Sequence, residues 1–174
     1  MNLQKMPDQG LCLPTSFAMA MDLPVAGILK QLGDWRKPVF PGLPEPLCWR
    51  GTHIQECIRI AQGLGFSVTP RELYPQVAPP RPIGPRSESY ENCPVALGDN
   101  WRTFTDVILL RRGVITGVRA VPLIGVVGHA VAYDHGLLYD PNGYEYRFSR
   151  EACEAHNFAT QCAWRIDRIA ETLL

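Results

Sequence analysis

The chain has 174 residues, 46% of them hydrophobic, and its 17 basic and 17 acidic side chains cancel. This length suits one domain with a sizeable core, so we expect a single domain over residues 1–174. The balanced charge gives no global electrostatic reason to expect a nucleic acid or an anionic membrane as partner. No apolar run reaches the roughly 18 residues that span a bilayer, and the first ten residues lack a signal peptide's apolar centre. We therefore expect a cytoplasmic protein.

The first 65 residues are predicted to be mainly helical. Apolar residues at helical spacing predict three helices, over residues 12–23, 22–33 and 52–65. Asp22 is the possible cap of the second helix, and Thr52 with Gln55 three residues later has the spacing of a capping box. Four prolines between residues 34 and 51 predict a loop between the second and third helices.

The rest of the chain is predicted to be mainly β-structure after a long connection. Residues 70–100 give no periodic signal and predict a surface excursion, and helical spacing resumes over 101–113. A helix capped by Ser149 is predicted over 149–158. Short β-rich runs predict strands over residues 66–70, 114–121, 124–134, 136–140, 144–149 and 161–169. Helices followed by an antiparallel meander indicate an α+β fold.

The cysteine pattern favours reduced thiols. No pair has the Cys-x-x-Cys spacing, and a chain without an export signal is expected to keep its thiols reduced. His53 and Cys57 could share a helix face, but no second pair follows at metal-ligand spacing, so neither a metal nor another cofactor is expected. The six cysteines are Cys12, Cys48, Cys57, Cys93, Cys153 and Cys162.

Cys12 is the candidate nucleophile. It ends a polar, glycine-bearing loop and begins the first predicted helix, with Pro14 in the first turn. The start of a helix carries exposed N–H groups and partial positive charge that stabilise a thiolate, and a backbone N–H there could bind an oxyanion. The alternative is a buried structural cysteine, which is common in proteins.

A base and a residue that orients it are predicted in the stretch GHAVAYDHGLLYDPNG. His129 lies early in one predicted strand and Asp140 ends the next, so antiparallel pairing can bring them together. Asn142 competes with Asp140 as the orienting residue. His129 could instead be a hydrogen-bonded core histidine, and Asp140 before Pro-Asn-Gly could be only a turn residue.

These two motifs, CLPTSFAMAM near the front and GHAVAYDHGLLYDPNG near the back, resemble the papain-like cysteine peptidases. The similarity is greatest to the family that trims double-glycine leaders from bacteriocin precursors, and to the C39-like proteins of bacteria and phages. The resemblance implies a papain-like α+β fold, with N-terminal helices packed on a C-terminal antiparallel sheet. It also implies that Cys12 is the nucleophile, that His129 is the general base and later acid, and that Asp140 holds the imidazole.

The family pattern also includes a glutamine whose amide completes the oxyanion hole, and here the sequence departs from it. The usual spacing of six residues before the cysteine places Met6 at that position. Gln4 fits if the loop carries two extra residues, whereas Gln9 lies only three residues before Cys12. We favour Gln4, with Gln9 as the alternative. Leu13 is a further departure, since leader peptidases commonly have glycine there.

The expected function is cleavage of a peptide or isopeptide bond through a thioester, with a protein or peptide as substrate. The same groups also support acyl transfer to another acceptor. A second hypothesis is a papain-like protein that has lost catalysis and serves as a binding protein, such as a phage-encoded inhibitor of a host protein. A metal-dependent hydrolase ranks last. Aromatic residues that could grip a peptide, or pack as lids, are Trp35, Trp49, Tyr74, Tyr90 and Trp101.

Overall fold

A computed structural model describes residues 1–45, 47–72, 108, 111–121 and 125–169. Most of the predicted excursion over 70–100 and of the predicted helix over 101–113 lies outside these residues. At the end of that predicted helix, Arg112 and Gly113 belong to a strand instead. The strand prevails because its pairing with two neighbouring strands satisfies the backbone on both sides.

The three front helices lie where the apolar spacing predicts them. They are α1 (Cys12–Ala20), α2 (Val25–Leu32) and α3 (Ile54–Gly63). α1 is almost wholly buried from Pro14 onward, in agreement with its run of small and apolar side chains. α2 and α3 each bury one face only.

The caps of α2 and α3 differ from the prediction. Asp22 does not cap α2: its φ is 54°, in the left-handed region, and its carboxylate forms ion pairs with Arg112 and the N-terminal amine. The first N–H of α2, on Val25, instead donates to the side-chain oxygen of Gln4 at 3.0 Å. The capping box of α3 joins His53 and Glu56, one residue later than Thr52 and Gln55, because the helix begins at Ile54.

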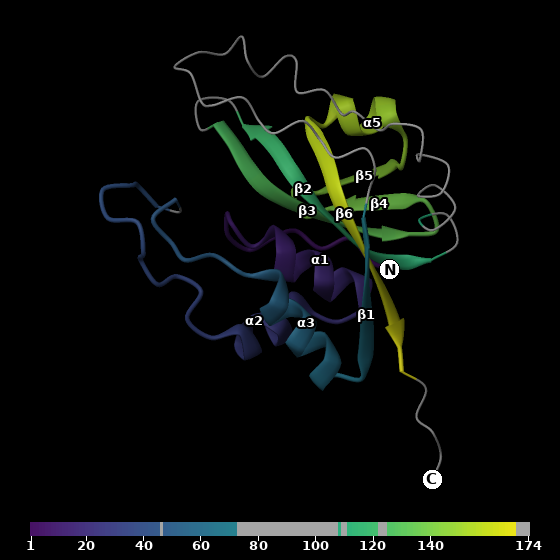
Figure 1. Cartoon of the computed structure of the whole chain (residues 1–174), viewed down its shortest axis with the longest axis horizontal. Helices are drawn as coiled ribbons and strands as arrows, with labels where there is room; N and C mark the ends of the chain where they lie inside the picture. Colours follow the sequence, from purple (N-terminus) through teal and green to yellow (C-terminus); the bar gives the residue numbers. More distant parts are fainter. Residues whose placement is uncertain (46, 73–107, 109–110, 122–124, 170–174) are drawn as a thin grey trace.

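The strands form one six-stranded antiparallel sheet in the order β1-β6-β2-β3-β4-β5 (Figure 1). The strands are β1 (Phe66–Glu72), β2 (Arg112–Val121), β3 (Gly125–Asp134), β4 (Leu137–Asp140), β5 (Tyr144–Arg147) and β6 (Phe158–Arg168). β2 to β5 follow one another in the sheet, which confirms the predicted meander. β3 and β4 are joined by His135 and Gly136, both with positive φ, as the tightest hairpin turns require.

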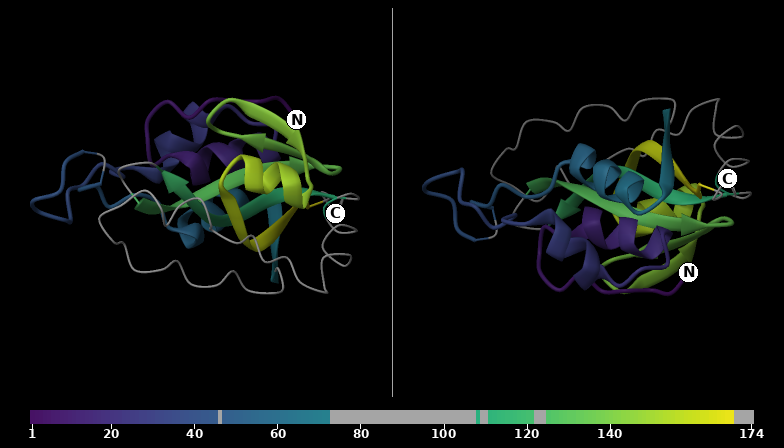
Figure 2. Two further views of the ribbon diagram at one scale, coloured as in Figure 1. Left: turned by 90° about the horizontal axis from the view of Figure 1, so that it is seen from above. Right: turned by 90° about the horizontal axis from the view of Figure 1, so that it is seen from below.

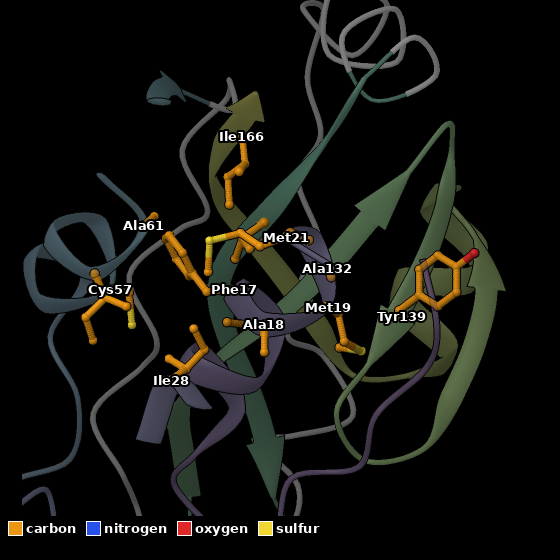
Figure 3. Packing of buried hydrophobic residues seen from close by; sticks show 14 of the residues in the cluster. Phe17, Ala18, Met19, Met21, Ile28, Cys57, Ala61, Ala132, Tyr139 and Ile166 are labelled. Carbon is orange, nitrogen blue, oxygen red and sulfur yellow. The ribbon is translucent and has the colours of Figure 1, made fainter. Parts of the chain in front are cut away.

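The helices cover the two faces of the sheet unequally. α1, α2 and α3 lie on one face, and α5 (Arg150–Ala155) lies on the other, as the views from above and below show (Figure 2). The larger core lies between the three front helices and the sheet, where Phe17 and Met19 of α1 meet Ile28, Cys57 and Ala132 (Figure 3). Ser149 caps α5 as predicted, since its hydroxyl accepts the N–H of Ala152 at 3.1 Å.

The second core lies between α5 and the opposite face of the sheet. Alternate residues of β3 therefore face different cores: Ala130 and Ala132 face α1, whereas Val131 and Tyr133 belong to the second cluster. The α+β class expected from the sequence is confirmed. Among the described residues, no helix is both long enough and apolar enough to cross a membrane.

Candidate active site

Cys12 is the first residue of α1, and the helix presents it to strand β3. One turn further, the Ser16 hydroxyl donates a hydrogen bond to the Ala130 carbonyl oxygen at 3.0 Å. This buried contact fixes α1 against the strand. The Cys12 Sγ lies 3.9 Å from the carbonyl oxygen of Gly128. The half-buried thiol therefore meets β3 one residue before His129.

His129 and Asp140 form a buried pair across β3 and β4. Ala132 is paired with Tyr139 in the ladder. The same register continued by one step would put Val131 opposite Asp140, which makes His129 the diagonal neighbour of Asp140 on the same face. The His129 Nε2 lies 3.0 Å from the Asp140 Oδ2, and the two side chains are 5% and 0% exposed. The alternation of side chains along β3 and β4 thus brings His129 and Asp140 together on one face of the sheet.

Asp140 is held from its other oxygen by the turn that follows β4. The backbone N–H and the side-chain amide of Asn142 donate to the Asp140 Oδ1 at 2.8 and 2.7 Å. The Met6 N–H donates to the Pro141 carbonyl at 2.9 Å, which ties this turn to the segment before α1. Asn142 therefore holds Asp140, and Asp140 contacts the imidazole. The alternative in which Asn142 itself orients the imidazole is wrong.

The electrostatics of the pair favour two opposite charges at neutral pH. Burial lowers the pKa of His129, but hydrogen bonds with Asp140 and Cys12, and their negative charges, outweigh burial and raise it to about 9. Burial raises the pKa of Asp140, but the imidazolium of His129 and the N–H groups of Asn142 bring it below its ordinary value. With Nε2 engaged by Asp140, Nδ1 is the ring nitrogen left for the thiol.

Two further residues surround the pair that sequence reasoning missed. Arg119 on β2 has Nη1 3.9 Å from the Asp140 Oδ2, and its side chain is partly exposed. The Phe158 ring meets the His129 ring edge-on, with centroids 5.4 Å apart. Arg119 lies opposite Val127, and so on the same face as His129. To predict the position of Arg119 from the sequence, one would need the register between β2 and β3, which the alternation of apolar residues alone does not determine.

A second thiol near Cys12 has a different character. Cys57 on α3 is buried, and burial together with the negative charges of Glu56 and Cys12 raises its pKa to about 12. A thiol with such a pKa stays protonated at neutral pH and is a poor nucleophile. Of these two free thiols, only Cys12 has an imidazole beside it.

Gln4 is not brought to Cys12. Its side-chain N–H donates to the Leu23 carbonyl at 2.8 Å, and its side-chain oxygen accepts from Val25. Its backbone N–H points to the sulfur of Met19, near the C-terminal end of α1. Both ends of the amide are therefore engaged beyond that end of α1, whereas Cys12 begins the helix. We correct the expectation that Gln4 completes an oxyanion hole: it supplies the missing cap of α2.

Gln9, the alternative, lies in the turn before α1. The Leu11 N–H approaches the Asp8 carbonyl at 3.4 Å, and Gly10 has a φ of 84°, so Gln9 and Gly10 are the centre of a tight turn. The Gln9 side chain is exposed. The backbone N–H groups of Cys12 and Leu13 have no acceptor within α1, so they are available as hydrogen-bond donors to an oxyanion.

The remaining histidines each have another role in the fold. His53 caps α3, His156 stacks on the Tyr146 ring at 4.0 Å between centroids, and His135 hydrogen-bonds Asp134 in the exposed turn. Within the described ranges, no three His, Cys, Asp or Glu side chains gather in a way that could hold a metal ion.

The arrangement combines a thiol at a helix start, an imidazole and a buried carboxylate. An imidazole beside a thiol can take its proton and later return a proton to a leaving group, while a carboxylate fixes the ring. This combination supports nucleophilic attack on a carbonyl carbon. No family model and no curated protein matches the chain.

Proposed function

We propose that the protein is a papain-like cysteine hydrolase that cleaves a peptide or isopeptide bond through a thioester on Cys12. The single observation that carries the proposal is the meeting of three elements: the start of α1, strand β3 and the end of β4. A structural cysteine has no need of a buried His129–Asp140 pair beside it, and that pair costs desolvation free energy.

The mechanism follows from the chemistry of these groups. The Cys12 thiolate attacks the carbonyl carbon, and the N–H groups at the start of α1 stabilise the oxyanion. The His129 imidazolium gives its proton to the leaving amine, which departs and leaves a thioester. His129 then takes a proton from water as water attacks the thioester, and the carbon–sulfur bond breaks to release the acid product and the Cys12 thiolate. Asp140, held by Asn142, keeps the ring oriented throughout.

A second function, a binding protein without catalysis, is favoured by one specific observation. The glutamine that best fits the family pattern, Gln4, caps α2 instead. An oxyanion hole that lacks one donor is less effective by about 10²- to 10³-fold in known hydrolases. Without Gln4, the oxyanion is left to the backbone N–H groups of Cys12 and Leu13, and Gln9 is the remaining side-chain candidate.

Selective alkylation distinguishes the two functions. We expect iodoacetamide at pH 6 to modify Cys12 far faster than Cys48, because both thiols are half-buried and only Cys12 has the imidazole of His129 beside it. Mass spectrometry of the digested protein after a time course gives the rate at each cysteine. Equal and slow modification of both thiols would favour the binding protein.

A further inference from the structure

Half of the large hydrophobic side chains that the described residues expose lie on one segment between α2 and α3. We call residues 37–50 the arm; Figure 1 shows it in blue, projecting away from the helices. The exposed apolar side chains of the arm are Val39, Phe40, Leu43 and Leu47. The other four are scattered over separate elements: Leu3, Leu64, Tyr144 and Ile169. A cluster of this kind on one projecting segment is a typical sign of an interaction surface.

The arm is folded at its base. The Val39 N–H donates to the Cys48 carbonyl at 2.8 Å, and the Arg50 N–H donates to the Lys37 carbonyl at 2.7 Å. Pro38 and Trp49 face each other between these bonds. The sequence places prolines at 38, 41, 44 and 46, which have no N–H to offer to a partner strand. A partner is therefore bound by the side chains of the arm rather than by strand addition.

Both ends of the arm are anchored by ion pairs, and one of these pairs involves the loop that leads to Cys12. The Arg36 guanidinium lies over the Trp35 and Trp49 rings, 4.9 and 5.1 Å from their centroids. It also pairs with Asp8, four residues before Cys12. At the other end, Arg50 Nη1 lies 2.8 Å from Glu56 Oε1 on α3. The two tryptophans expected to grip a peptide thus pack on each other and hold the arm.

We propose that the arm binds an apolar, extended stretch of the polypeptide substrate, and this inference rests on the function proposed above. Four residues of chain span at most about 14 Å, so the Cα of Asp8, whose side chain pairs with Arg36, lies within about 14 Å of the Cα of Cys12. Phe40 is another four residues beyond Arg36. A substrate with its scissile carbonyl at Cys12 would therefore reach the arm with residues several positions away from the cleaved bond.

A peptide-retention experiment tests the arm without depending on cleavage. The Cys12→Ser protein is immobilised and exposed to a peptide mixture made by digesting a bacterial lysate with trypsin, and the retained peptides are sequenced by mass spectrometry. We expect enrichment of peptides that carry runs of Leu, Phe and Val. Adding Phe40→Ser and Leu43→Ser should reduce this enrichment at least about tenfold, because two half-exposed apolar contacts are lost.

The matched control is Ile169→Ser, since Ile169 is 54% exposed and Phe40 is 53% exposed. That variant should retain the same peptides as Cys12→Ser alone, and thermal unfolding of each variant establishes that it is folded. Equal retention by the arm variant would overturn the proposal. So would a concentration-dependent dimer that the arm substitutions abolish, because a second copy would then cover the arm. Iodoacetamide selectivity of the wild-type protein reports on the proposed function separately.

Discussion

The hairpin of β3 and β4 carries two histidine–aspartate pairs whose surroundings are very different. At the turn, His135 Nδ1 lies 2.6 Å from Asp134 Oδ1, and the imidazole is 69% exposed. At the open end, His129 Nε2 lies 3.0 Å from Asp140 Oδ2, and the imidazole is 5% exposed. Each aspartate also has an arginine, Arg112 beside Asp134 and Arg119 beside Asp140.

This comparison teaches that a histidine–aspartate contact does not make a site. The imidazole of His135 is exposed to water, which weakens its electrostatic interaction with Asp134. His129 lies in a dry environment, where hydrogen bonds to Asp140 and Cys12 raise its pKa to about 9 against the effect of burial. Burial and the neighbouring thiol distinguish the candidate base from a surface histidine.

The largest expected effect is on the reactivity of Cys12. Replacing His129 by alanine removes the imidazolium that stabilises the Cys12 thiolate, so the rate of Cys12 alkylation by iodoacetamide at pH 6 should fall on the order of 10²-fold. His135→Ala should leave that rate within about twofold, because the exposed His135 imidazole hydrogen-bonds Asp134 in the turn. Rates come from mass spectrometry of a quenched time course. A similar loss in both variants would show that the buried pair has no special role.

The next effect concerns the free energy of unfolding. Asp140→Ala leaves the buried His129 without its partner and should cost about 3 to 5 kcal/mol. Asp134→Ala removes contacts of a partly exposed network and should cost about 1 kcal/mol. Urea denaturation monitored by tryptophan fluorescence measures both values. The contrast fails if Asp140→Ala is no more destabilising than Asp134→Ala.

Stability should also depend on pH through His129. Its pKa is raised from 6.5 to about 9 in the folded protein, so the folded state binds the proton more tightly than the unfolded chain. This contribution is fully present below pH 6.5 and is lost as the pH rises to about 9, which lowers the free energy of unfolding by up to about 3 kcal/mol. Urea denaturation at pH 6, 7.5 and 9 measures the slope. His129→Gln should flatten it; an unchanged slope would assign the effect to other groups.

The smallest effect is expected from the residues that hold the two carboxylates. Asn142→Ala removes the side-chain donor to Asp140 inside a buried site and should cost about 1 to 2 kcal/mol in stability. Arg112→Gln, which removes the arginine from the exposed pair, should cost less than about 1 kcal/mol. The same urea measurements compare the two. A larger loss from Arg112→Gln would reverse the ranking of the two regions.

Much of the fold could be predicted because local patterns act within short stretches. Pro14 and the apolar run after Cys12 indicate where α1 starts, and β-rich runs around Asp134–Gly136 indicate the hairpin that carries His129. The residues that cap the helices were harder to predict. Thr52 and His53 both precede α3, and both can cap it. The spacing of residues in the sequence therefore does not decide which of the two is the N-cap.

The role of Gln4 could not be predicted from local sequence, because it depends on a tertiary contact. Its distance from Cys12 along the chain suggests a role beside the thiol, but the amide is used where α2 begins, because Pro24 leaves the first N–H of α2 without a side-chain cap. That choice depends on how the N-terminal segment crosses α1 and the α1–α2 connection. No spacing rule within the first helix contains this information.

By itself, the sequence determined the α+β class, the helix start at Cys12 and the strands that carry His129 and Asp140, since propensity and alternation are properties of neighbouring residues. The tertiary structure decided which groups meet: Arg119 and Phe158 beside the pair, Asn142 on the carboxylate, and Gln4 away from the thiol. The physical reason is that contacts between distant segments depend on sheet register and helix packing. Several registers satisfy the same local pattern, and only the whole buried core selects one.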